Sequence, residues 1–123
     1  MKIIIAGGRD FNRWGVFFTT INKWEYIITE VVCGDAAGAD TLGALWAKEH
    51  NIPVKHFPAN WNVYGKASGF IRNAEMGEYA DGLIAFWDGK SKGTKHMIQT
   101  MKFQKKPYKV YNYNGELIDE GGK

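Results

Sequence analysis

Residues 83–101, LIAFWDGKSKGTKHMIQTM, decide the fold, because they hold a strand, a glycine-bearing loop and a helix in direct succession. Residues 83–87 form a continuous apolar run, which is typical of a strand buried on both faces of a sheet. Met97, Ile98 and Met101 follow with helical spacing and predict a helix with one apolar face. A strand followed at once by a helix is the building unit of a parallel sheet.

Four further apolar runs repeat this pattern along the chain. They predict strands at residues 3–6, 31–33, 54–57 and 108–111. Segments with helical spacing predict the intervening helices, at residues 14–24 with Asn12 as N-cap, at 42–50 and at 70–79. The chain therefore alternates strand and helix over nearly its whole length.

Apolar strands that alternate with helices predict a parallel sheet covered by helices on both faces. Right-handed crossovers then give a Rossmann-like, doubly wound α/β fold with a mostly parallel five-stranded sheet. The tail 111–118 contains Asn114-Gly115, a strong hairpin signal, and predicts a small C-terminal hairpin.

The composition is that of a single globular domain. Its 123 residues suffice to bury roughly two thirds of the unfolded surface, so residues 1–123 are expected to form one domain. A net charge of +3 is mild and does not favour duplex DNA as a partner. The single Cys33 excludes an internal disulfide, and the first apolar run is too short for a signal or membrane segment. A cytoplasmic location without membrane contact is expected.

In a doubly wound sheet, ligands bind beyond the carboxyl ends of the strands, near the point where the strand order reverses. Gly7, Gly8 and Arg9 follow the first strand. Two glycines let a backbone approach a ligand and offer N–H groups to an anion. The pattern is not GxGxxG, so it is no dinucleotide fingerprint. A tight turn with Arg9 in solvent is the structural alternative.

Gly34, Asp35, Gly38 and Asp40 follow the second strand, in a loop of small residues that runs straight into a helix. The small residues leave the helix N-terminus open, where N–H groups and the helix dipole favour an anion. Asp40, in the first turn, is expected either to cap the helix or to accept a hydrogen bond from a ribose hydroxyl.

The segment 60–76 combines aromatic and basic residues before and within a helix. Trp61 is a candidate to stack on a base, together with the nearby Tyr64, although both also suit a lid over the core. Lys66 and Arg72 are candidates to pair with phosphate, Arg72 through its planar guanidinium. Asn73 either reads a polar edge of the ligand or braces the loop.

The loop 88–95 follows the fourth predicted strand and ends at a helix N-terminus. Ser91 or Thr94 can cap that helix, and the lysines of the loop add positive potential. Three glycine-bearing turns at one edge of the sheet favour a pocket for a phosphorylated ligand. Four residues of this loop complete the predicted binding set: Asp88, Ser91, Gly93 and Thr94.

Four motifs in this order, GGRDF, CGDAAGAD, YGKASGFIRNAEM and ADGLIAFWDGKSKGTKHM, resemble those of the YspA-like SLOG family of small bacterial and phage proteins. The resemblance covers about residues 2–110. It implies a Rossmann-like domain that binds nucleotides or nucleotide-derived ligands such as ADP-ribose or NAD derivatives. The wider superfamily includes the Lonely Guy phosphoribohydrolases and the DNA-processing protein A, which binds single-stranded DNA.

The phosphoribohydrolase signature, M-x-x-R-K followed by P-G-G-x-G-T-x-x-E, is present only in part. Arg72 matches its arginine, and Gly93-Thr94 match its G-T pair. Met97, however, stands in place of the catalytic glutamate. A thioether can neither stabilise oxocarbenium-like charge nor position water. Three carboxylates remain as candidate substitutes, and spacing selects none of them: Glu75, Asp88 and Asp40.

The predicted function is capture of a phosphorylated, nucleotide-type small molecule, as a sensor or a sequestering protein. Hydrolysis of the N-glycosidic bond of nucleoside phosphates is the first alternative. Binding of single-stranded nucleic acid through aromatic and lysine side chains is the second. No resident cofactor and no metal site are predicted. The sequence leaves open whether the protein is an enzyme and whether it forms a homo-oligomer.

Overall fold

The computed structural model describes residues 1–34 and 38–122 and has a six-stranded sheet at its centre. The strands lie side by side in the order β3-β2-β1-β4-β5-β6. Their bounds are β1 (Lys2–Gly7), β2 (Glu30–Cys33), β3 (Val54–His56), β4 (Gly82–Phe86), β5 (Tyr108–Tyr111) and β6 (Leu117–Gly121). All neighbouring strands are parallel except β5 and β6. This confirms the predicted Rossmann-like α/β fold, with the strand order reversing between β1 and β4.

The C-terminal hairpin is part of the sheet. β6 pairs antiparallel with β5, so the sheet has six strands where the sequence predicted five and a separate hairpin. The turn contains Asn114-Gly115 as predicted, and Gly115 adopts a φ of 86° that favours glycine. Asn112 Oδ1 stabilises the turn by accepting the N–H groups of Asn114 and Glu116, each at 3.0 Å.

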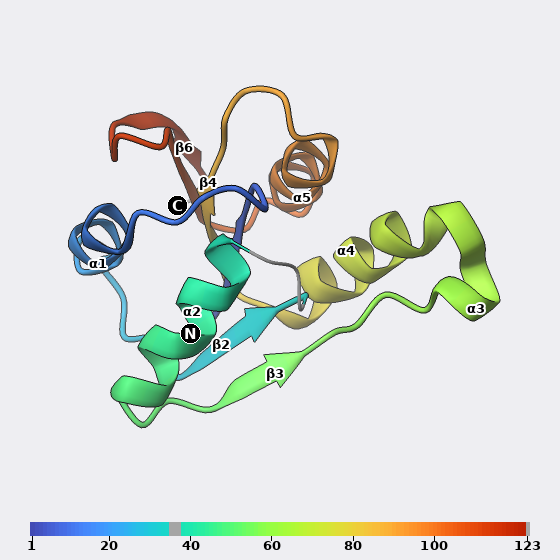
Figure 1. Cartoon of the computed structure of the whole chain (residues 1–123), viewed down its shortest axis with the longest axis horizontal. Helices are drawn as coiled ribbons and strands as arrows, with labels where there is room; N and C mark the ends of the chain where they lie inside the picture. Colours follow the sequence, from blue (N-terminus) through green and yellow to red (C-terminus); the bar gives the residue numbers. More distant parts are fainter. Residues whose placement is uncertain (35–37, 123) are drawn as a thin grey trace.

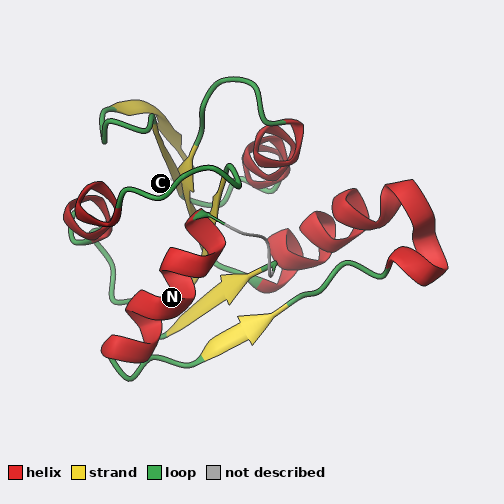
Figure 2. Cartoon of the chain, viewed as in Figure 1, coloured by secondary structure: helices red, strands yellow, loops and turns green. Residues whose placement is uncertain are grey.

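Helices cover both faces of the sheet (Figure 1 and Figure 2). They are α1 (Trp14–Ile21), α2 (Ala39–Glu49), α3 (Trp61–Tyr64), α4 (Ser68–Tyr79) and α5 (Lys92–Phe103), with a 3₁₀ turn at Gly65–Ala67. α1 and α2 pack on one face, and α4 and α5 pack on the other. α3 and the start of α4 project from the body as an arm (Figure 1). None of the helices in the described ranges is long and apolar enough to cross a membrane.

The continuous apolar runs are explained by burial on both faces. Ile3, Ile4 and Ile5 of the central strand β1 are each 0% exposed. Ile3 and Ile5 belong to the core beneath α1 and α2. Ile4 points the other way, into the core beneath α4 and α5. A strand with alternating polar residues would bury polar groups on one of these faces.

Two helix starts differ from those predicted. The N-cap of α1 is Arg13 instead of Asn12, and no side chain caps this helix, which ends at Ile21. α2 begins at Ala39, earlier than the apolar spacing predicted, with Gly38 as its N-cap. Gly38 has a φ of 77°, which favours glycine because it carries no Cβ. Apolar spacing therefore located the helices but not their first residues.

Lys106 fixes the C-terminal end of α4. Its ammonium group donates to the carbonyl oxygens of Gly77, Glu78 and Ala80 at 2.8, 3.0 and 2.7 Å. The last carbonyl groups of a helix have no N–H partner within it, and a cation also opposes the negative end of the helix dipole. The loop between α5 and β5 therefore anchors the end of α4.

Replacing this lysine tests the anchor. Lys106→Met keeps the aliphatic stem and removes the hydrogen bonds, so we expect the free energy of unfolding to fall by about 1.5–3 kcal/mol. Urea unfolding followed by circular dichroism measures the change. The control is Lys23→Met at an exposed position, which should change the free energy by less than about 0.5 kcal/mol. A Lys106→Met effect no larger than the control would contradict the anchoring role.

Candidate functional site

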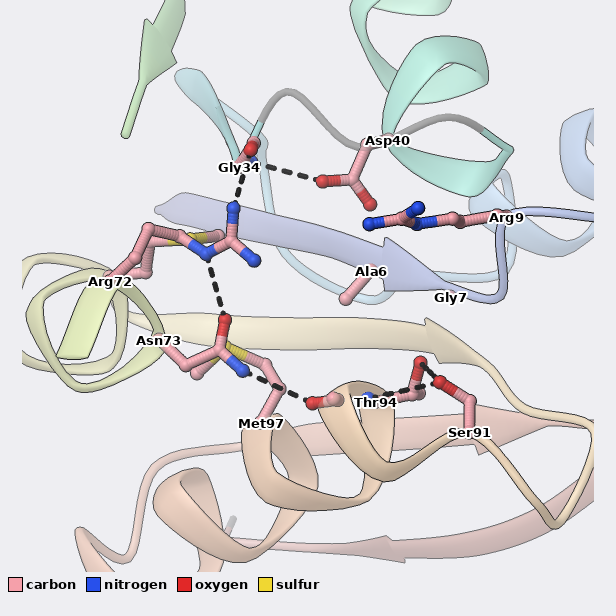
Figure 3. A pocket seen from close by; sticks show the side chains of 12 residues that line it. Ala6, Gly7, Arg9, Gly34, Asp40, Arg72, Asn73, Ser91, Thr94 and Met97 are labelled. Atoms are coloured by element: carbon pink, nitrogen blue, oxygen red, sulfur yellow. Dashed lines mark hydrogen bonds between the residues drawn. The ribbon is translucent and has the colours of Figure 1, made fainter. Parts of the chain in front are cut away.

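A pocket of about 230 Å³ lies at the carboxyl edge of the sheet, where the strand order reverses between β1 and β4. The end of β1, the loop after β2 and parts of α2, α4 and α5 meet there (Figure 3). The lining residues are Ala6, Gly7, Arg9, Gly34, Asp40, Arg72, Asn73, Met76, Ser91, Gly93, Thr94 and Met97. Ligand sites in doubly wound sheets occupy this position.

Arg72 enters the pocket from α4 in a fixed orientation. Its Nη1 donates to the carbonyl oxygen of Gly34 at 2.5 Å, and its Nε donates to Asn73 Oδ1 at 3.1 Å. A Cβ at position 34 would lie 2.5 Å from Nη1, so glycine is needed there to admit the guanidinium. Figure 3 shows the other terminal nitrogen directed into the pocket. Two nitrogens thus position the side chain, and the third faces the cavity.

Asn73 links α4 to the first turn of α5. The residue is 6% exposed, and its Nδ2 donates to the carbonyl oxygen of Gly93 at 3.1 Å. The same nitrogen lies 3.3 Å from His96 Nδ1. Burial lowers the pKa of His96, which favours the neutral ring that can accept this hydrogen bond. Asn73 therefore braces the wall formed by the two helices.

Asp40 supplies a buried carboxylate from the first turn of α2. Its Oδ2 accepts the N–H of Gly34 at 3.0 Å, and the residue is 6% exposed. Figure 3 shows the guanidinium of Arg9, from the loop after β1, beside this carboxylate. The carboxylate thus ties the start of α2 to the end of β2 and gives the pocket one negative group near two cations.

The N-terminal end of α5 forms the wall opposite α2 (Figure 3). Ser91 is its N-cap: Oγ accepts the N–H of Thr94 at 3.4 Å and lies 3.1 Å from Thr94 Oγ1. The N–H groups of Lys92 and Gly93 are in the first turn, where no acceptor exists within the helix. Apart from the neighbouring residues and the backbone of α5 itself, a Cβ at Gly93 would meet no protein atom within 4 Å. This end of α5 therefore has both the donors and the room for an anion.

Asp88 braces the loop before α5. Its Oδ1 accepts the N–H groups of Lys90 and Ser91, both at 2.8 Å. These hydrogen bonds lower the pKa of the carboxyl group, and the one from Ser91 has the largest effect. Trp87 adds a second brace, because its indole Nε1 donates to the carbonyl oxygen of Ser91 at 3.1 Å. The loop that the sequence predicted to form part of a pocket for a phosphorylated ligand is thus held in shape by its own side chains.

The structure brings many of the predicted binding residues to this pocket: Gly7, Arg9, Gly34, Asp40, Arg72, Asn73, Ser91, Gly93 and Thr94. Their binding role remains a prediction. Other predicted residues do not line the pocket: Gly8, Gly38, Lys66 and Asp88. Asp35 and the side chain of Trp61 lie outside the described part of the chain. Ala6 and Met76 line the pocket without having been predicted to, and Met97 lines it although it stood outside the predicted binding set.

The residues outside the pocket have other environments. A Cβ at Gly8 would lie 2.0 Å from the hydroxyl oxygen of Tyr113, and one at Gly38 would lie 2.1 Å from the carbonyl oxygen of Gly8. Protein packing therefore accounts for both glycines. Lys66 is exposed in the 3₁₀ turn of the projecting arm.

The two methionines of the pocket also belong to the core beneath α4 and α5. Met76 is 2% exposed and Met97 is 1% exposed. Helical spacing marked Met97 as part of an apolar stripe, and the resemblance to hydrolases placed it at a catalytic position. Together these two signals were enough to locate it in the pocket wall, whereas Met76 carried only the first.

Two sequence comparisons bear on the family of the chain. Residues 1–64 match the sequence model of the YspA, cpYpsA-related SLOG family, a segment that includes Arg9, Gly34 and Asp40. The chain is also similar to the Gene 61 protein of Mycobacterium phage D29, with 30% identity over 122 residues, covering 91% of this chain and 95% of that protein. The chain therefore belongs to the YspA, cpYpsA-related SLOG family.

Proposed function

We propose that this protein binds a nucleotide or a nucleotide-derived small molecule at the carboxyl edge of the sheet. One observation carries the proposal: Arg9 and Arg72 share a single cavity with the N-terminal end of α5. Guanidinium groups and helix N-termini both favour phosphate oxygens. Membership of a SLOG family supports a nucleotide-related function in general.

The size of the pocket favours the phosphate and sugar parts of such a ligand. Its volume of about 230 Å³ is below the roughly 300–1,000 Å³ of pockets that enclose a drug-sized molecule. A phosphate and a ribose are accommodated inside, while the base, or the second half of an ADP-ribose or NAD-type ligand, extends over the rim. We therefore expect nucleoside monophosphates to make most of the contacts that larger derivatives make.

The charges favour one phosphate inside the pocket. Arg9 and Arg72 bring two positive charges and Asp40 brings one negative charge, and α5 adds partial positive charge at its N-terminus. A monophosphate complements this balance. The carboxylate of Asp40 repels a second phosphate but accepts a hydrogen bond from a hydroxyl group. We therefore assign phosphate to Arg72 and the start of α5, and a ribose hydroxyl to Asp40.

Within this proposal, the protein acts as a sensor of its ligand or sequesters the ligand. In the resemblance to the phosphoribohydrolases, Met97 stands in place of the catalytic glutamate, and a thioether supports no acid–base chemistry. Hydrolysis of the N-glycosidic bond is the second candidate, and one observation favours it. Of the three carboxylates that the sequence offered, Asp40 lines the pocket, whereas Glu75 and Asp88 do not.

Arg72 provides the direct test of the phosphate site. Arg72→Ala should weaken the binding of AMP by on the order of 2–4 kcal/mol, roughly thirty- to a thousandfold, because a charge-assisted pair is lost. Arg72→Lys should recover little, since an ammonium group cannot hold Gly34 and Asn73 while it also faces the phosphate. Isothermal titration calorimetry with AMP, ADP-ribose and NAD measures the affinities.

The matched control removes an exposed positive charge outside the pocket. Lys66→Ala should change the affinity for AMP by less than about threefold, because solvent and salt screen this lysine. Thermal unfolding of each variant checks that it is folded. Equal affinity of wild type and Arg72→Ala for every nucleotide tested would refute the phosphate site.

An assay of base release separates the two candidate functions. If the protein only binds, wild type should release no base from nucleoside monophosphates or from NAD during hours of incubation, as measured by liquid chromatography. Reproducible release that is lost in Asp40→Asn and kept in Glu75→Gln would establish the hydrolase instead. Release that persists in both variants would point to a contaminating enzyme, which a second purification of wild type would remove.

A further inference from the structure

The C-terminal hairpin contacts the loop that carries Arg9. The hydroxyl group of Tyr113 donates to Asp10 Oδ1 at 2.6 Å. Arg13 Nη1 donates to Asn114 Oδ1 at 2.6 Å and to the carbonyl oxygen of Tyr113 at 3.3 Å. The ring of Tyr113 also packs on Phe11, with the ring centroids 5.0 Å apart. These contacts join two loops from opposite ends of the chain.

Arg9 lies at the centre of the turn that the hairpin holds. The N–H of Phe11 donates to the carbonyl oxygen of Gly8 at 3.2 Å, which closes a tight turn with Arg9 and Asp10 as its central residues. Tyr113 contacts this turn at Asp10 and at Phe11. Within the turn, Arg9 is the residue that lines the pocket. The backbone that presents Arg9 is therefore held by the hairpin.

The same contact accounts for glycine at position 8. A Cβ there would lie 2.0 Å from the hydroxyl oxygen of Tyr113 and 2.8 Å from Asp10 Oδ1. Gly8 itself does not line the pocket. The second glycine of the pair therefore makes room for the hydrogen bond between Tyr113 and Asp10.

The chemistry of the bond suits a permanent contact. Burial is the main cause that raises the pKa of Tyr113, and the hydrogen bond to Asp10 raises it further. The phenol therefore keeps its proton and remains a donor at neutral and mildly alkaline pH. The bond also engages the carboxylate that follows Arg9 in the sequence. A carboxylate without such a partner would attract the neighbouring guanidinium and compete with a ligand for it.

We propose that Tyr113 is a positioning residue of the pocket, which holds the turn that presents Arg9 to the ligand without touching the ligand itself. The role of Arg9 in this proposal rests on the nucleotide binding proposed above. Tyr113 does not line the pocket, so this assignment adds to the site a residue that acts only through the turn that it holds.

A double-mutant cycle with AMP as the probe tests the coupling. Tyr113→Phe keeps the ring on Phe11 and removes only the hydroxyl group, and it should raise the Kd for AMP about three- to tenfold. In an Arg9→Ala background the same change should have almost no effect, because the turn then has no guanidinium to present. Tyr26→Phe, at an exposed position before β2, is the matched control and should leave the Kd unchanged.

Hydrogen–deuterium exchange without nucleotide gives a readout that does not depend on binding. Peptides that span residues 8–13 should exchange faster in Tyr113→Phe than in wild type, while peptides from β4 should not change. If wild type fails to bind AMP, the proposed function fails, and the exchange rates still decide whether Tyr113 holds the turn. Unchanged exchange over residues 8–13, or an equal loss of affinity with and without Arg9, would overturn the positioning role.

Discussion

The geometry of the pocket depends on the backbone of one residue, Gly34. Its N–H donates to Asp40 and its carbonyl oxygen accepts from Arg72, so one residue at the end of β2 holds two side chains of opposite charge. Asn73 continues the connection from Arg72 to the first turn of α5. Three helices are thereby positioned relative to the end of β2. Loss of Asp40 leaves the buried N–H of Gly34 without this acceptor, which costs more than a surface hydrogen bond contributes.

The fold could be predicted because its strands are covered on both faces. Strands covered on both faces must be apolar throughout. Short apolar runs that alternate with helical segments are compatible with only a few sheet topologies. The rule that ligands bind at the carboxyl edge then brought together residues as distant in sequence as Arg9, Arg72 and Thr94. What the pattern could not show is that the hairpin would pair with β5 and extend the sheet. Local turn signals carry no information on which edge a hairpin joins.

The site was less predictable because a residue type does not reveal its partner. Gly8 follows a strand as a ligand-contacting glycine would, yet its neighbour is Tyr113 from the far end of the chain. Asp88 resembles a binding carboxylate, yet it accepts two N–H groups of its own loop. Lys66 has the right charge but lies on the projecting arm. Arg72 differs from these, because its place on α4 at the strand-end face followed from the fold itself.

The anchoring of α4 by Lys106 has a kinetic consequence. The C-terminal end of this helix is held by Lys106, and its first half is held through Arg72 and Asn73. A wall restrained at both ends has little freedom to open or close. If the proposed nucleotide binds here, its entry requires no displacement of the helix, and its association rate is set by diffusion into a cleft that holds two arginines. Rising ionic strength should therefore slow association more than it speeds release.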